Sequence, residues 1–78
     1  MTARRFKVLL EWDSADRVWV TYVPALDNVS THGDTRDEAL ENTNEAILGY
    51  VEAAEKEGLL IPTGGPEVEL VEVEVITT

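Results

Sequence analysis

The sequence contains no cysteine, so disulfide bonds, thiol nucleophiles and cysteine-ligated metal sites are excluded. It also lacks an apolar run approaching the roughly 18 residues that a membrane-spanning helix requires. No apolar segment of the kind found in signal peptides precedes the first predicted strand. We therefore expect a cytoplasmic protein with no membrane contact.

Basic residues are scarce, with six Lys and Arg against sixteen Asp and Glu and a formal net charge of −10. A protein that grips phosphate needs a basic patch, so direct nucleic-acid binding is not expected. Three basic residues, Arg4, Arg5 and Lys7, cluster near the N-terminus. We interpret residues 1–5 as a mobile, solubilising leader. An acidic surface attracts basic partners, such as a basic nucleic-acid-binding protein.

The apolar content is nevertheless that of a folded protein. The 44% hydrophobic composition separates the chain from disordered acidic sequences, and 78 residues allow one domain spanning residues 1–78. Such a small domain buries little surface on folding and has a small net stability, and oligomerisation commonly supplies additional stability at this size. A homo-oligomer is expected.

Alternating apolar residues predict a hairpin at the start of the domain. In residues 6–12, Phe6, Val8, Leu10 and Trp12 share one face, and Lys7, Leu9 and Glu11 share the other. Residues 13–16 form a turn rich in Asp and Ser, and residues 17–23 form a second strand with apolar residues on both faces. Pro24 should end that strand, because proline cannot donate to a β-ladder.

A helix is predicted next. Asn28 tolerates a left-handed turn before a short strand at residues 29–32, and Gly33 closes this strand. Thr35 and Glu38 match a capping box, in which Thr35 accepts from the Glu38 amide and the Glu38 carboxylate accepts from the Thr35 amide. The helix should run from residue 36 to about 57, with Gly58 in a left-handed C-terminal position. Its apolar stripe contains Ala39, Leu40, Thr43, Ala46, Ile47, Tyr50, Val51 and Ala54.

The chain should finish with a strand. Residues 60–62 are predicted to be extended and residues 63–66 to form a loop. From Val68, apolar residues alternate with Glu72 and Glu74, with a change of parity that suggests a bulge. The expected fold is α+β with the order β-β-β-α-β, a single helix packed on one face of a small mixed sheet. A right-handed crossover would place the fourth strand parallel to the third and beside the first.

Several residues are candidates for a partner or oligomer interface. One helix covers one sheet face, so Leu9, Trp19 and Val23, or their neighbours of opposite parity, should point to the other face. Leu48 lies off the helical stripe and is a further exposed apolar candidate. Glu72 and Glu74 favour a solvated strand edge, and they are candidates for electrostatic steering of a partner.

Three short motifs together resemble the HicB-like antitoxin family: residues 22–26 (YVPAL), residues 31–35 (THGDT) and residues 38–47 (EALENTNEAI). They follow its V-P-x-L, G-x-T-x-x-E-A and N-x-x-E-A-I pattern, and the resemblance covers about residues 6–62. It implies a partial RNase H-like fold and an antitoxin that binds and occludes HicA, a small basic RNA-cleaving toxin. Asn28 stands where the family often has Gly. No DNA-binding segment follows in this sequence, so operator binding is not carried over.

The carboxylates are better explained by local structure than by catalysis. A metal-dependent nuclease needs several carboxylates converging on divalent ions, and two groups are available, Glu11, Asp13 and Asp16, and Asp34, Asp37 and Glu38. These positions favour turn residues, first-turn acids and a helix cap. His32 is interpreted as a strand-end residue, and Gly64-Gly65 as a turn without the following Gly-Lys-Ser/Thr of a phosphate loop. No catalytic residue, metal or cofactor is predicted.

The leading hypothesis is a HicB-like interaction module that occludes a HicA-like basic toxin. The alternatives are a metal-dependent RNase H-like nuclease and a self-associating structural protein without a toxin partner.

Overall fold

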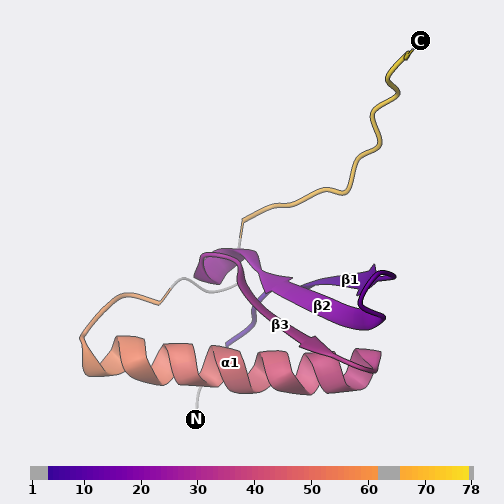
Figure 1. The fold of residues 1–78 in the computed structure, drawn as a ribbon. Coiled ribbons are helices and arrows are strands. Elements are labelled where there is room, and N and C mark those ends of the chain that lie inside the picture. Colours follow the sequence, from indigo (N-terminus) through magenta and orange to yellow (C-terminus); the bar gives the residue numbers. More distant parts are fainter. Residues whose placement is uncertain (1–3, 62–65, 78) are drawn as a thin grey trace.

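A computed structural model describes residues 4–61 and 66–77 of the chain. It contains three strands in the order β1-β2-β3, all antiparallel, with one helix, α1, along one face of the sheet. Figure 1 shows α1 lying beneath the strands and the C-terminal residues running away on the opposite side. The expected α+β class and the order of the first four elements are confirmed.

The first two strands form the predicted hairpin. β1 spans Leu9–Asp13 and β2 spans Val18–Val23, with Leu10 opposite Thr21 and Trp12 opposite Trp19. Asp13 Oδ1 accepts from the amides of Ala15 and Asp16 at 3.0 and 3.1 Å, so this carboxylate shapes the turn. β1 is shorter than predicted, since residues 7 and 8 precede it without strand pairing.

A tight corner leads to the third strand. Pro24 ends β2 and opens the 3₁₀ helix η1, Pro24–Leu26, whose Leu26 is fully buried. Asp27 and Asn28 both adopt positive φ angles, 53° and 57°, and the Asn28 amide donates to the Val23 carbonyl at 3.0 Å. The chain then enters β3, Val29–Gly33, which pairs with β2.

α1 spans Arg36–Lys56, within one residue of the predicted end. Thr35 Oγ1 accepts from the Glu38 amide at 3.1 Å, as predicted. The Glu38 carboxylate differs from the prediction, because it accepts from the Asp34 amide, at 3.3 Å, and not from that of Thr35. Gly58 has the expected left-handed φ of 69°, and the Leu59 amide donates to the Ala54 carbonyl at 2.9 Å.

The sheet has one covered face and one open face. α1 packs against β3 and, less extensively, β2. The side chains that face it include Thr21 and Val23 of β2, both fully buried, and Thr31 of β3. Alternation along the strands and pairing between them place a second set on the open face: Leu9, Glu11, Asp13, Val18, Val20, Tyr22, Ser30 and His32.

The predicted fourth strand is not formed by the described residues. Residues 66–77, called the tail below, have no regular secondary structure and leave the body of the domain as an extended projection. The sheet is consequently antiparallel rather than mixed. Alternating apolar residues favour a strand only where a neighbour supplies backbone partners and a surface to cover. Within the described part of the chain, the tail beyond its first residues runs away from the sheet and pairs with no strand.

The end of the leader is held in place. Arg4 Nη1 donates to Glu55 Oε1 at 2.8 Å, near the C-terminal end of α1. Arg4 is thus not the free charge that a mobile leader implies, while residues 1–3 of that leader lie outside the described residues. The loop predicted at residues 63–66 is described only at Pro66, because residues 62–65 also lie outside.

Candidate interaction surfaces

A cluster of three threonines joins α1 to one face of the sheet. Thr21 Oγ1 lies 2.5 Å from Thr43 Oγ1 and 2.8 Å from Thr31 Oγ1, and Thr31 and Thr43 are joined at 2.8 Å. The Thr43 hydroxyl also donates to the Ala39 carbonyl at 2.8 Å. Buried hydroxyls require partners, and this cluster supplies them for one residue from each of β2, β3 and α1.

A second polar contact fixes the same junction. Asn42 Nδ2 donates to the His32 carbonyl at 2.8 Å, joining α1 to the end of β3. This explains an asparagine within a helix, where its propensity is poor. Both junctions lie over β3, so the helix does not cover β1 to the same extent.

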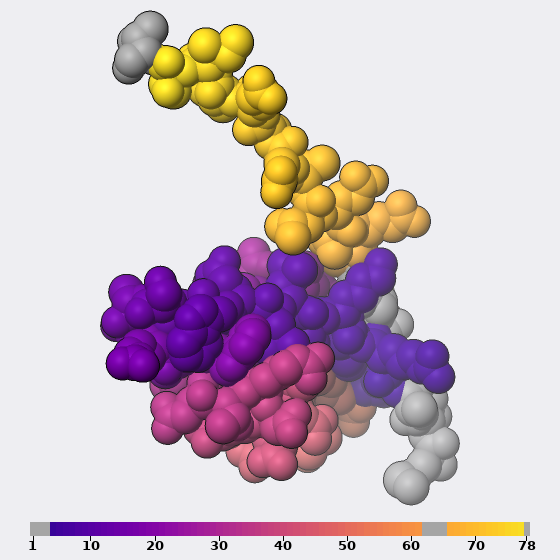
Figure 2. Space-filling view, turned by 90° about the vertical axis from the view of Figure 1, so that its right-hand side faces the viewer, coloured from indigo at the N-terminus to yellow at the C-terminus, as the bar shows by residue number. Residues whose placement is uncertain are grey.

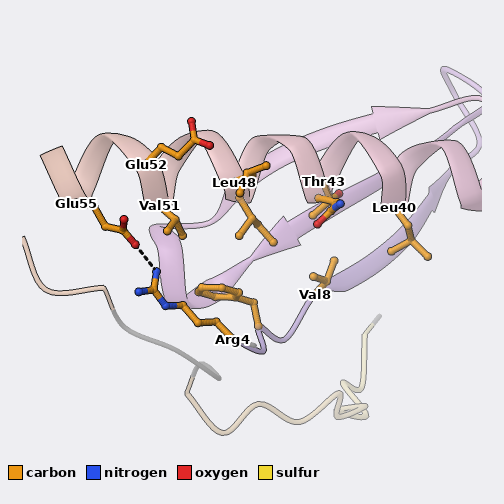
Figure 3. Close-up of a pocket in the computed structure, with 11 residues that line it drawn as sticks. Arg4, Val8, Leu40, Thr43, Leu48, Val51, Glu52 and Glu55 are labelled. Atoms are coloured by element: carbon orange, nitrogen blue, oxygen red, sulfur yellow. Dashed lines mark hydrogen bonds and ion pairs between the residues drawn. The ribbon is translucent and has the colours of Figure 1, made fainter. Parts of the chain in front are cut away.

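An apolar groove of about 690 Å³ lies between α1 and the chain leading into β1. Figure 3 shows Leu40, Leu48 and Val51 on the helix side of it and Val8 on the opposite side. Phe6 and Ile47 complete its apolar lining. Leu48 is 56% exposed, so the groove presents apolar surface to solvent.

The rim of the groove is charged. Arg4 and Glu55 form the ion pair that spans one end, as the dashed line in Figure 3 shows, and Glu52 lies nearby on α1. Lys7 precedes β1, and its Nζ donates to the Pro66 carbonyl at 3.2 Å. The start of the tail therefore lies beside the start of β1.

The open face of the sheet is a second, differently shaped surface. A hollow of about 340 Å³ is lined there by residues of all three strands and of the β1–β2 turn: Asp13, Asp16, Val18, Val20, Ser30, Thr31 and His32. Val18, Val20 and Tyr22 are partly buried, and Leu9 is exposed. This face combines an apolar centre with the carboxylates of Glu11, Asp13 and Asp16.

The predicted interface residues fall on different surfaces. Leu9 lies on the open face, and Leu48 lines the groove. Trp19 faces the helix side, where its ring lies 5.5 Å from that of Trp12. Val23 has no exposed surface, so it belongs to the core. Of the two alternatives left open by the sequence for β2, the neighbours of opposite parity, Val18, Val20 and Tyr22, lie on the open face, and Trp19 and Val23 do not. Glu72 and Glu74 are exposed on the tail.

Sequence reasoning missed the groove and the threonine cluster. The prediction that one face carries Phe6, Val8, Leu10 and Trp12 is correct. Alternation along a strand does not show, however, how far α1 extends over these residues. The threonines of the cluster stand at positions that face the core: Thr21 and Thr31 on the helix-facing side of their strands, and Thr43 in the apolar stripe of the helix. Three hydroxyls at core positions were the available signal for the cluster, because buried polar groups require one another.

Two carboxylates of the candidate metal-binding groups have structural roles. Asp13 accepts from two turn amides, and Glu38 accepts from the Asp34 amide beside the helix cap. Among residues 4–61 and 66–77, no group of three or more His, Asp or Glu residues is placed to hold a metal ion. Within the same described ranges, no helix is long and apolar enough to cross a membrane.

Comparison with known proteins identifies the family. The chain is 38% identical over 63 residues to UPF0150 protein Ta0767 of Thermoplasma acidophilum, an alignment that covers 81% of this chain and 90% of that protein. No family model matches the chain, and no solved structure matches it. A small α+β domain with this degree of identity over nearly the whole of a relative defines a homologue. The chain belongs to the UPF0150 family.

Proposed function

We propose that the domain is a HicB-like antitoxin that binds a small, basic, RNA-cleaving HicA-like toxin through the open face of its sheet. The observation that carries this proposal is the composition of that face, on which an apolar centre adjoins three carboxylates. The motifs at residues 22–26, 31–35 and 38–47 support the HicB-like assignment. The proposed site of action is the cytoplasm, where such a toxin meets its RNA substrate.

The open face has the composition of a protein interface for a basic partner. Val18, Val20 and Tyr22 form a partly buried apolar row on β2, and Leu9 extends it onto β1. Apolar residues of this kind anchor a complex when they lose water. Asp13 and Asp16 lie at one end of the row and Glu11 lies beside its middle, opposite Val20, so all three could meet basic side chains of the toxin.

In this proposal the net negative charge of the domain raises the rate of association with the toxin and does not anchor the complex. At a formal net charge of −10, the domain attracts a basic protein before the two surfaces touch. Glu72 and Glu74 on the tail contribute to this steering in the proposed mechanism. Binding blocks the toxin sterically, because a protein seated on its RNA-binding surface excludes the substrate.

We propose binding rather than catalysis as the activity. The Glu38 carboxylate, for example, accepts from the Asp34 amide beside the helix cap and so has a structural role. The protein of this proposal uses no cofactor and makes no direct contact with nucleic acid.

Two leucines on different surfaces provide the test. Leu9 is 45% exposed on the open face and Leu48 is 56% exposed in the groove, so Leu9→Lys and Leu48→Lys are matched in chemistry and exposure. Leu9→Lys should raise the dissociation constant for the proposed HicA-like toxin by at least about tenfold, equivalent to about 1.4 kcal/mol. Leu48→Lys should leave it unchanged within a factor of about two.

Titration calorimetry on the purified chains measures both constants, and circular dichroism verifies that each variant is folded. Equal affinities for wild type and Leu9→Lys would remove the open face from the interface. Absence of binding by the wild-type chain would refute the antitoxin assignment.

A further inference from the structure

The tail carries a strand-forming pattern whose apolar side chains the structure leaves in solvent. Leu70, Val71, Val73, Val75 and Ile76 are each at least 70% exposed. Figure 2 shows the tail projecting from the body of the domain. Burial of apolar surface stabilises a protein by roughly 25 cal/mol for each Å² removed from water, and these five aliphatic side chains do not gain that free energy in the single chain. A segment of this composition is typical of an interface.

The domain also has an edge that accepts a strand. β1 pairs with β2 on one side, and no other strand among the described residues pairs with its outer side. An unpaired strand edge presents a row of free N–H and C=O groups, to which an extended segment can add by β-augmentation. The apolar groove adjoins this edge, since Phe6 and Val8, which lead into β1, form one of its walls.

The shapes of the tail and the groove are complementary. Val71, Val73 and Val75 share one face of an extended chain, while Glu72 and Glu74 share the other with Leu70 and Ile76. A strand added to β1 with its valines toward α1 would direct these three side chains into the groove against Leu48 and Val51, and would leave both glutamates, with Leu70 and Ile76, on the opposite face. The groove and the tail each expose apolar surface that the other can cover.

The charges are complementary as well. The tail carries Glu67 and Glu69 near its start, and half of the six basic residues of the chain, Arg4, Arg5 and Lys7, lie just before β1, where Arg4 is already paired with Glu55. In a protein with a net charge of −10, this is the most basic segment that an acidic strand can approach.

We propose that the tail of one copy pairs with the outer edge of β1 in a second copy and fills its groove, and that the exchange is reciprocal. The second copy is favoured over the same chain by the course of the tail. Pro66 is held beside Lys7 of its own chain, yet the residues that follow run away from the domain. Each chain has one tail and one groove, so in a twofold dimer each groove is filled by the tail of the other chain. This inference does not depend on the proposed toxin.

The experiment measures the mass of the full-length chain and of three variants by analytical ultracentrifugation over a range of micromolar concentrations. Val73→Glu places a charge in the groove, and Leu48→Lys alters the groove itself. Glu74→Gln is the matched control, because its side chain points away from the groove. Circular dichroism verifies the fold of each variant, which should be retained because residue 73 makes no core contact in the single chain.

The wild-type chain and Glu74→Gln should be dimers, and the dissociation constants of Val73→Glu and Leu48→Lys should be at least about tenfold higher. In a mixture of differently isotope-labelled chains, contacts between the tail valines and Val8 or Leu48 should be intermolecular. A monomeric wild-type chain would overturn the proposal, whether its tail amides are protected by pairing within the chain or exchange freely. A dimer that survives Val73→Glu, or that shows only intramolecular tail contacts, would overturn it too.

Discussion

Thr21 and Thr43 are joined hydroxyl to hydroxyl at 2.5 Å, across the interface between β2 and α1. Both are almost fully buried, and the pair is completed by Thr31, so each hydroxyl has a partner in an otherwise apolar environment. The helix is thereby held in one register over the sheet, because sliding it by one residue would leave buried hydroxyls unpaired.

Thr43→Val should lower the free energy of unfolding by about 1–3 kcal/mol, because Thr21 and Thr31 then lose a partner in a buried site. Chemical denaturation measures the change. The triple variant T21V/T31V/T43V should be less destabilised than the sum of the three single variants, since it leaves no orphaned hydroxyl in the cluster. Additive losses would show that the three hydroxyls do not act as a network.

Gly33→Ala should destabilise the fold by about 1–3 kcal/mol. A Cβ at residue 33 would meet the backbone of α1, including Ala39 Cα at 2.9 Å, and a helix backbone cannot move aside as a side chain can. Gly49→Ala is the control within the same protein. A Cβ there meets nothing within 4 Å, so this variant should gain about 0.5–1 kcal/mol from helix propensity. Thermal unfolding of the pair should therefore shift in opposite directions.

Thr35→Ala should cost about 1 kcal/mol, because the Glu38 amide loses the acceptor that caps α1. Glu41→Ala, an exposed change within the same helix, should alter stability by less than about 0.5 kcal/mol. Equal unfolding midpoints for Thr35→Ala and wild type would argue against this cap as the origin of the helix start.

Association with the basic partner should slow as salt is raised, because screening at physiological ionic strength acts over about 8 Å. Dissociation should change much less, since the proposed complex desolvates the apolar anchor of the open face. Stopped-flow or surface-based kinetics at several salt concentrations separate the two rates. A salt effect confined to dissociation would contradict electrostatic steering.

The sequence predicts this fold well wherever the determining interactions are local. Asp13 in its turn, Asn28 at positive φ, Thr35 at the helix start and Gly58 at its end all behave as expected, because each acts within a few residues of itself. The Glu38 carboxylate accepts from the amide of Asp34, one residue before the predicted donor, Thr35. These two amides are neighbours in the chain, and the path of the backbone before the helix decides which of them the carboxylate reaches.

Properties that depend on distant neighbours could not be predicted in the same way. The burial of Val23 depends on which sheet face α1 covers, and periodicity alone leaves the two faces of β2 equally apolar. The alternation in the tail indicates a tendency to form a strand, but pairing requires a partner edge that the pattern does not specify. The groove likewise arises from the position of α1 over β3 and β2, which is set by long-range packing.

Growth of cells tests most directly whether this domain neutralises a basic toxin through the open face of its sheet. The candidate toxin, a small basic HicA-like protein, is expressed alone, with the wild-type domain, with Leu9→Lys and with Leu48→Lys. We predict growth arrest by the basic protein alone, rescue by wild type and by Leu48→Lys, and weaker rescue by Leu9→Lys. A basic protein that is harmless, or whose toxicity the wild-type domain does not relieve, would contradict the proposed neutralisation.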